Sequence, residues 1–169
     1  MIRLRDLISE NKNIKYNIYQ DMDGCLTDFD KAYYELTGTK SHIATDKLSK
    51  PDFWKPISDA GKDWWANMEW MPDGKKLWNY IKKYNPTLLS SPSKEKTSAE
   101  GKKIWVKREL SNTPLILARS FEKKKWATPT SILIDDRESN IKDWRSKDGI
   151  GILHKSASDT IKQLKQLGL

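Results

Sequence analysis

The segment IKYNIYQ at residues 14–20 continues directly into DMDG at residues 21–24. Isoleucine and tyrosine favour an extended strand, and the Asp- and Gly-containing sequence after them is typical of the turn that ends one. Asp21 and Asp23 are two residues apart, so they point to the same side if the chain stays extended. Because like charges repel, this pair predicts a site for a divalent cation, and oxygen ligands suit Mg²⁺.

Two other interpretations apply to residues 21–24. Asp and Gly are common turn residues, so an ordinary turn remains an alternative at this point. A calcium loop of the EF-hand type needs Asp or Asn at its fifth position and Gly at its sixth. This chain has Cys25 and Leu26 there, which excludes that loop.

Strand-like and helix-like segments alternate along most of the chain. After residues 14–20, the expected strands are 87–90, 115–118, 131–134 and 150–153. Apolar residues at helical spacing predict helices at 28–39, 75–84 and 95–110, a short helix with Ile141 and Trp144, and a C-terminal helix. Residues 40–73 contain several Pro and Gly residues and predict short helices without a strand. This order predicts an α/β fold, a Rossmann-like parallel sheet with helices on both faces.

The composition excludes several classes of protein. A single cysteine in 169 residues rules out a disulfide scaffold and a Cys-rich zinc module. The two histidines, His42 and His154, have no metal-ligand spacing, so a His-based zinc site or a Ser-His-Asp triad is not expected. No apolar run is long enough for a transmembrane helix, and the first residues lack a signal peptide. We therefore expect a cytoplasmic protein of a reducing compartment, without membrane contact.

Positive charge is concentrated in one part of the sequence. The net charge is +8, and residues 75–126 alone hold 14 basic and 4 acidic residues. A cationic stretch of this kind attracts phosphate-bearing partners, so nucleic acid is a possible partner of residues 75–126. A solvated face that only confers solubility is the alternative interpretation of these lysines.

Further chemical groups follow the other expected strands, and ligands in parallel sheets lie beyond the carboxyl ends of strands. Asp135 and Asp136 follow residues 131–134, and a second acidic pair at a second strand end predicts an oxygen-lined cation site. Ser90 and Ser91 follow a third strand, where hydroxyl groups can bind an anionic oxygen or cap a helix. Lys102 and Lys103 lie on the next predicted helix, and a lysine there suits phosphate or simply faces solvent.

This order of motifs resembles the haloacid dehalogenase-like (HAD) phosphatase superfamily. The segments are more closely similar to those of the 5'(3')-deoxyribonucleotidases, over about residues 14–154. DMDGCLTDF (21–29) resembles their DMDGVLADF, and SSP (90–92) resembles their TSP. GKKIWV (101–106) is similar to EKYAWV, ILAR (116–119) to ILTR, and LIDDR (133–137) to the end of LLIDDR. Five similar segments in the same order make chance agreement improbable.

The resemblance implies a mechanism and roles for named residues. Asp21 would be the nucleophile that forms an aspartyl-phosphate, and Asp23 would be the general acid and base. Mg²⁺ would be held by Asp21, the carbonyl of Asp23 and Asp136, with Asp135 supporting the ligand shell. The phosphate-binding residues would be Ser90, Ser91, Lys102 and Arg119. Lys103 is an alternative to Lys102, and Lys107 is a more distant one.

The resemblance also implies a division of the chain into two parts. The HAD-like core would comprise residues 1–26 and 72–169, with residues 1–13 as an N-terminal arm or helix. Residues 27–71 would form a small helical cap, and Phe29 and Trp54 would close over the base of a nucleotide. The chain departs from the family in having Ser90 in place of Thr and a longer segment at residues 120–126, so substrate choice depends on this region.

Three functions are therefore considered. The first is a magnesium-dependent phosphatase of nucleoside monophosphates, preferably deoxyribonucleotides. The second is a phosphatase that acts on phosphorylated nucleic-acid ends, which the basic residues 75–126 favour. The third is an inactive binding module on the same fold, against which the four carboxylates of Asp21, Asp23, Asp135 and Asp136 argue. A sugar phosphatase is a further possibility, because a fold does not choose its substrate.

Overall fold

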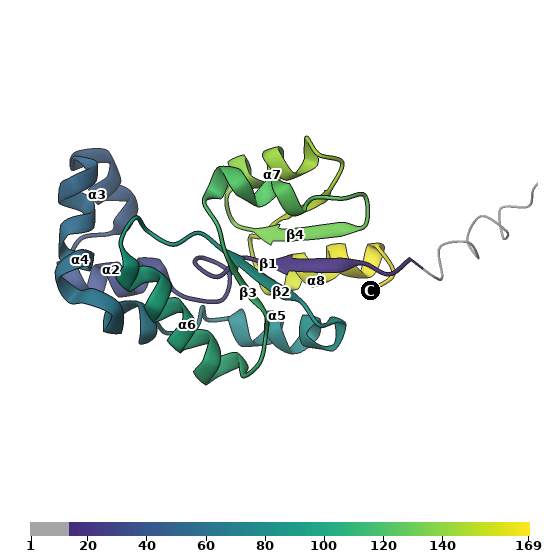
Figure 1. The fold of residues 1–169 in the computed structure, drawn as a ribbon, viewed down its shortest axis with the longest axis horizontal. Helices are drawn as coiled ribbons and strands as arrows, with labels where there is room; N and C mark the ends of the chain where they lie inside the picture. Colours follow the sequence, from purple (N-terminus) through teal and green to yellow (C-terminus); the bar gives the residue numbers. More distant parts are fainter. Residues whose placement is uncertain (1–13) are drawn as a thin grey trace, which may run out of the picture.

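The computed structural model describes residues 14–169, and its centre is a five-stranded parallel sheet with the order β3-β2-β1-β4-β5 (Figure 1). The strands are β1 (Asn17–Gln20), β2 (Thr87–Ser90), β3 (Leu115–Leu117), β4 (Ser131–Asp135) and β5 (Ile150–Leu153). The sequence predicts the position of each strand, although β1 begins three residues later than expected. The predicted α/β class, a parallel sheet covered by helices, is confirmed.

β1 is central because its main chain pairs with β2 on one side and with β4 on the other. Tyr19 is in register with Thr87 of β2 and with Leu133 of β4. The pairing with β4 continues beyond β1, since the N–H of Asp21 donates to the carbonyl oxygen of Ile134 at 2.9 Å. All strands run in one direction, so the residues that follow β1, β2 and β4 lie side by side at one edge of the sheet.

Helices cover both faces of the sheet, because the apolar side chains of each strand alternate between two cores. Ile18 and Ile132 pack against α5 (Gly74–Ile81), α6 (Lys96–Leu110) and α8 (Ala157–Gln166) on one face. Leu89 and Leu133 pack against α7 (Glu138–Arg145) on the other. Figure 1 shows α7 on the opposite side of the sheet from α5 and α6. The 3₁₀ segments are η2 (Lys82–Tyr84) and η3 (Ser120–Trp126).

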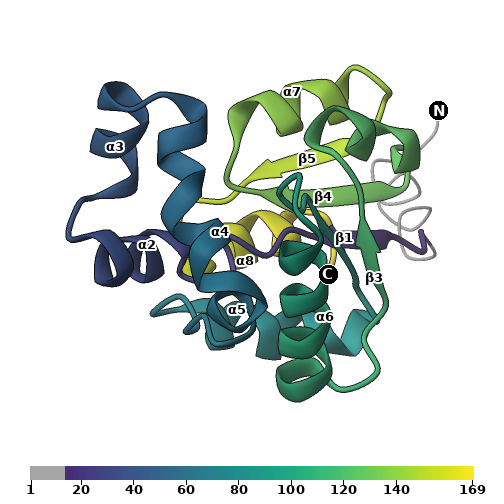
Figure 2. The ribbon, with the colours of Figure 1, turned by 60° about the vertical axis from the view of Figure 1, so that its left-hand side comes forward.

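Three helices separate β1 from α5 and lie beyond the carboxyl edge of the sheet (Figure 2). They are α2 (Phe29–Thr37), α3 (Ser41–Lys47) and α4 (Lys50–Ala66), and we call them together the helical insertion. The α4 span covers two helical segments that meet at Gly61, in agreement with the short helices that the sequence predicts here. Pro56 lies within the first segment, and Gly61, with a φ of 72° and a ψ of −159°, departs from helical geometry between the two segments.

Two other expectations have different outcomes. The longer segment at residues 120–126, for which no helix is expected from the sequence, forms the 3₁₀ helix η3. The expected arm or helix at residues 1–13 lies outside the described residues. Among residues 14–169, no helix has the length and apolar character needed to cross a membrane.

Gly101 allows α6 to approach α4 closely and so joins the helical insertion to the core. A Cβ atom at this position would lie 2.4 Å from the carbonyl oxygen of Lys62 and 2.4 Å from the Cβ of Trp65. Both distances are far below van der Waals contact, so no other residue fits without moving one helix. The next residue along α6 is Lys102, which places this contact beside a candidate site residue.

Replacing Gly101 with alanine should lower the free energy of unfolding by about 1–3 kcal/mol, because the added methyl group overpacks the contact. Urea denaturation followed by tryptophan fluorescence measures the change. Glu100→Ala, at the exposed neighbouring position, is the matched control and should change stability by less than about 0.5 kcal/mol. Equal stability of the two variants would show that the helices are not in close contact.

Candidate active site

Asp21 and Asp23 lie at the end of β1 on a tight turn over the carboxyl edge of the sheet. The carbonyl oxygen of Met22 accepts hydrogen bonds from the main-chain N–H groups of the three residues 25–27. Gly24 adopts a φ of 79°, in the left-handed region that glycine tolerates best. Glycine is also required sterically, since a Cβ atom there would lie 2.2 Å from Oδ2 of Asp136.

Asp135 and Asp136 end β4 and differ in their surroundings. Asp135 is fully buried and accepts hydrogen bonds from Nδ2 of Asn140 to both oxygens, at 3.0 and 2.9 Å. The N–H of Arg137 donates to the Oδ1 atom of Asp135 at 3.0 Å. Asp136 is exposed at the surface. Asp135 is therefore a fixed internal support, whereas Asp136 is available to a ligand.

Lys123 joins the two strand ends and was not singled out from the sequence. Its Nζ donates to Oδ1 of Asp21 at 2.9 Å and to Oδ2 of Asp135 at 2.7 Å. The residue is 2% exposed, although the neighbouring Lys125 is exposed. The signal that could have identified Lys123 is its place soon after a strand, at the same sheet edge as the acids.

Lys102 reaches the second carboxylate of the turn. Its Nζ donates to Oδ2 of Asp23 at 2.6 Å, and the residue is 1% exposed. The hydroxyl of Thr27 donates to the other oxygen of Asp23 at 2.9 Å. Lys103 and Lys107 are exposed on α6. Of these three lysines, only Lys102 lies against a candidate catalytic carboxylate.

The predicted phosphate-binding residues lie in different places. Ser90 is 1% exposed, and its hydroxyl has no hydrogen-bond partner among the described residues. Ser91 contacts Ser120 of η3 through their hydroxyl groups at 3.4 Å. Arg119 is exposed just before η3, and within residues 14–169 no ion pair joins it to the four acids. Because buried hydroxyl groups are rarely left without a hydrogen bond, the Ser90 hydroxyl is suited to bind a polar atom of a ligand.

Aromatic side chains of the helical insertion gather near the site. Phe29 is half-buried and packs edge-on against Trp54, with ring centres 6.2 Å apart. Trp54 is 37% exposed, so one part of its ring faces solvent. A separate cavity of about 400 Å³ lies along α2 and α4, and none of the predicted site residues lines it.

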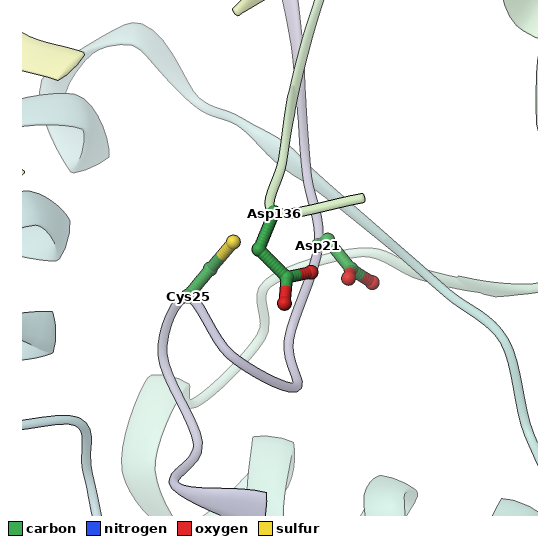
Figure 3. Close-up of side chains that lie close together, drawn as sticks. All are labelled: Asp21, Cys25 and Asp136. Atoms are coloured by element: carbon green, nitrogen blue, oxygen red, sulfur yellow. The ribbon is translucent and has the colours of Figure 1, made fainter. Parts of the chain in front are cut away.

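Asp21, Cys25 and Asp136 lie close together, and Figure 3 shows the Asp136 side chain between the other two. One potential ligand atom from each lies within 4.8 Å of the others. The sequence predicts no site role for Cys25. Burial and the charge of Asp21 raise the pKa of its thiol well above the usual range, so the thiol stays protonated. Mg²⁺ prefers hard oxygen ligands, so the two carboxylates suit it better than the sulfur of Cys25.

Burial and like charges raise the pKa of two carboxyl groups. Burial and the charges of Asp135 and Asp23 raise the pKa of Asp21 to about 7, although Lys123 acts in the opposite direction. Partial loss of hydration among the surrounding protein atoms and the charge of Asp135 raise the pKa of Asp136 to about 6, although the residue keeps exposed surface. Burial lowers the pKa of Lys123, but the charges of Asp21 and Asp135 outweigh burial, so its pKa is raised.

The residues present fit a divalent metal ion. The site holds two lysine ammonium groups, of Lys102 and Lys123, and four carboxyl groups, of Asp21, Asp23, Asp135 and Asp136. When all four carboxyl groups are ionised, two negative charges have no compensating cation. Carboxylate oxygens are hard ligands of the kind that Mg²⁺ prefers. Asp21 and Asp136 would hold such an ion, which would favour their ionised forms.

Solved structures with a similar fold are hydrolases. A hydrolase from Streptococcus pneumoniae is 14% identical, with a TM-score of 0.56 and coverage of 90% of this chain and 100% of that one. A proposed HAD hydrolase from Bacillus subtilis, bound to magnesium, is 7% identical, with a TM-score of 0.55 and coverage of 93% and 100%. A predicted phosphatase from Clostridium acetobutylicum is 13% identical, with a TM-score of 0.53 and coverage of 92% of each chain.

These similarities show that the chain has the HAD-like fold, as the sequence analysis expects. No protein-family model matches the sequence, and no curated protein sequence matches it. The similarity to solved structures is low in sequence and extends over nearly the whole chain. It defines the architecture, whereas the activity depends on the residues of the site.

Replacing Lys123 with methionine should lower the free energy of unfolding by about 3–5 kcal/mol in metal-free buffer, because two buried carboxylates lose their cation. Chemical denaturation with chelator present measures this loss. Lys124→Met is the matched control, since Lys124 only contacts Asp143 at 3.7 Å near the surface and should cost less than about 1 kcal/mol. A similar loss in both variants would contradict the bridging role of Lys123.

Proposed function

We propose that this chain is a magnesium-dependent phosphomonoesterase that hydrolyses nucleoside monophosphates, with deoxyribonucleotides preferred. The observation that carries the proposal is the meeting of Asp21 and Asp136, whose ligand atoms lie within 4.8 Å although they come from different strands. Lys102 and Lys123 place two buried ammonium groups at the same edge. The similarity of five segments to 5'(3')-deoxyribonucleotidases supports the nucleotide substrate.

Asp21 is the proposed nucleophile of the first step. Its carboxylate oxygen forms a bond to phosphorus, and the bond from phosphorus to the alcohol oxygen of the substrate breaks. Lys123 holds Oδ1 of Asp21 and so fixes the orientation of the carboxylate. The bound Mg²⁺ would neutralise the negative charge that otherwise repels the phosphate dianion.

Asp23 is the proposed proton donor and acceptor. In the first step its carboxyl group gives a proton to the departing alcohol oxygen. In the second step its carboxylate takes a proton from water, which attacks phosphorus and releases Asp21 and phosphate. Thr27 and Lys102 each donate a hydrogen bond to one oxygen of Asp23. When a phosphoryl oxygen of the substrate binds Lys102 instead, Oδ2 of Asp23 becomes free to carry the transferred proton.

Ser90 and Lys102 would bind the phosphoryl oxygens. The Ser90 hydroxyl is buried at the end of β2 and has no partner among the described residues, so it is free to donate to an anionic oxygen. Lys102 follows on α6 and already lies at a carboxylate. Phe29 and Trp54 offer ring surface for the base, and Trp54 is partly exposed where a nucleoside could approach.

A substrate panel tests this proposal directly. The chain should release phosphate from nucleoside 5'- and 3'-monophosphates with Mg²⁺ and lose activity with chelator. Asp21→Asn should reduce turnover by more than about 10³-fold while the circular dichroism spectrum is kept, because the amide is a poor nucleophile. Retained turnover in this variant would contradict Asp21 as the nucleophile, and no release from any monoester by the unmodified chain would contradict the proposed activity.

The distribution of basic residues favours a second candidate, a phosphatase of nucleic-acid ends. Of the 14 basic residues between 75 and 126, only Lys102 and Lys123 are buried. The remaining ones leave a cationic surface on α5, α6 and η3. Phe121 of η3 is 58% exposed, and the exposed residues Arg119 and Lys125 lie close to it in the sequence. An exposed ring beside cations suits a single-stranded base and its phosphates.

Salt dependence separates the two candidates. For a mononucleotide substrate, kcat/KM should change by less than about threefold between 50 and 200 mM NaCl. For an end-phosphorylated oligonucleotide that contacts several phosphates, it should fall by at least about tenfold, because counterions are released on binding. Faster turnover of oligonucleotides than of every monomer, together with this salt dependence, would favour the second candidate over the first.

A further inference from the structure

Lys102 is enclosed between two partners from different parts of the chain. On one side its Nζ donates to Oδ2 of Asp23 at 2.6 Å. On the other side the same atom lies 5.0 Å from the centre of the Trp65 ring. Lys102 belongs to α6 of the core, whereas Trp65 belongs to α4 of the helical insertion. The insertion therefore touches the lysine that faces the proposed general acid.

The Trp65 ring takes the place of solvent around the Lys102 ammonium. An ammonium group has three N–H donors, and in the described part of the chain Asp23 is the acceptor that Lys102 reaches. The electron-rich face of an indole attracts a cation, most strongly when water is excluded. Lys102 and Trp65 are both buried, so this attraction is not weakened by solvent. The ring favours the position of Nζ near Asp23 over other rotamers of the long side chain.

Trp65 is itself held firmly. Its ring stacks on that of Trp54, with centres 6.5 Å apart and planes inclined by 19°. Trp64 packs edge-on against it at 4.9 Å. Its Cβ lies against Gly101, the residue directly before Lys102, where no side chain separates the two helices. Its position relative to Lys102 is thus set by close packing on several sides.

We propose that Trp65 is a positioning residue for the reaction, which holds the Lys102 ammonium toward Asp23 and the phosphoryl group. This inference rests on the proposed phosphomonoesterase function. It implies that the helical insertion contributes to the chemical step as well as to substrate choice. Trp65 does not touch the reacting atoms in this account, and it acts through Lys102.

Kinetics with p-nitrophenyl phosphate test the proposal, because this substrate has no nucleobase for Trp65 to contact. Trp65→Leu should lower kcat by about 10-fold or more, with KM changed by less than about threefold. Trp65→Phe keeps a ring face and should recover part of the loss. It also serves as the main variant if the leucine variant does not fold.

Trp70→Leu is the matched control. Trp70 also has a lysine over its ring, with Nζ of Lys75 at 5.8 Å from the ring centre, but this pair does not include a site residue. Its kcat should stay within about twofold of the unmodified chain. Equal losses of kcat in Trp65→Leu and Trp70→Leu would overturn the proposal, since a general loss of packing would then explain both.

A double-mutant cycle tests whether Trp65 acts through Lys102. If it does, the variant with both Lys102→Met and Trp65→Leu should be no slower than Lys102→Met alone. Losses that multiply in the double variant would overturn the proposal, because Trp65 would then act independently of Lys102.

An NMR measurement tests the position of Lys102 without relying on enzymatic activity, so this inference and the proposed function can fail separately. The indole ring should shift the ammonium signal of Lys102 upfield, and the signal is assigned by its loss in Lys102→Met. Trp65→Leu should abolish the shift, and Trp70→Leu should leave it unchanged. An unshifted signal in the unmodified chain would overturn the positioning of Lys102. Failure to hydrolyse any phosphate monoester, with the shift present, would instead overturn the proposed function.

Discussion

The ion pairs between two buried lysines and the acids at the ends of β1 and β4 are the constraint on which the site depends. Lys123 contacts Asp21 and Asp135 together, and Lys102 contacts Asp23. Without these ammonium groups the parallel pairing of β1 with β4 would bring like charges together inside the protein, which is costly. The fold therefore has to supply cations at the same edge as the acids. It does so from α6 and η3, the segments that follow β2 and β3.

The helical insertion is closely joined to the core at this edge. Gly101 permits contact between α4 and α6, and the adjacent Lys102 then lies between a tryptophan and a carboxylate. Ser58 of α4 also hydrogen-bonds Glu95 at the start of α6. These contacts make the aromatic cluster and the carboxylate cluster neighbouring parts of one structure. A movement of the helical insertion away from the core has to break these contacts.

The sequence predicts the strands well because short β-branched and aliphatic runs bounded by turn residues are local signals. It predicts the convergence of Asp21 and Asp136 because parallel strands share a carboxyl edge. The position of residues 123–125 soon after β3 indicates that a lysine there can reach this edge, but three consecutive lysines without apolar periodicity do not show which one does. Gly61 interrupts α4, as its sequence signal indicates, whereas Pro56 lies inside the first helical segment without ending it. The contact at Gly101 leaves no local pattern in a single sequence.

The central position of β1 has a consequence for biosynthesis. Its partner β4 begins at Ser131, more than 100 residues later, so β1 must wait with one side unpaired while most of the chain is translated. The closing of so long a loop is entropically costly and slow. The acids of the nascent polypeptide therefore remain apart until β4 has emerged from the ribosome, and truncated translation products lack an assembled centre.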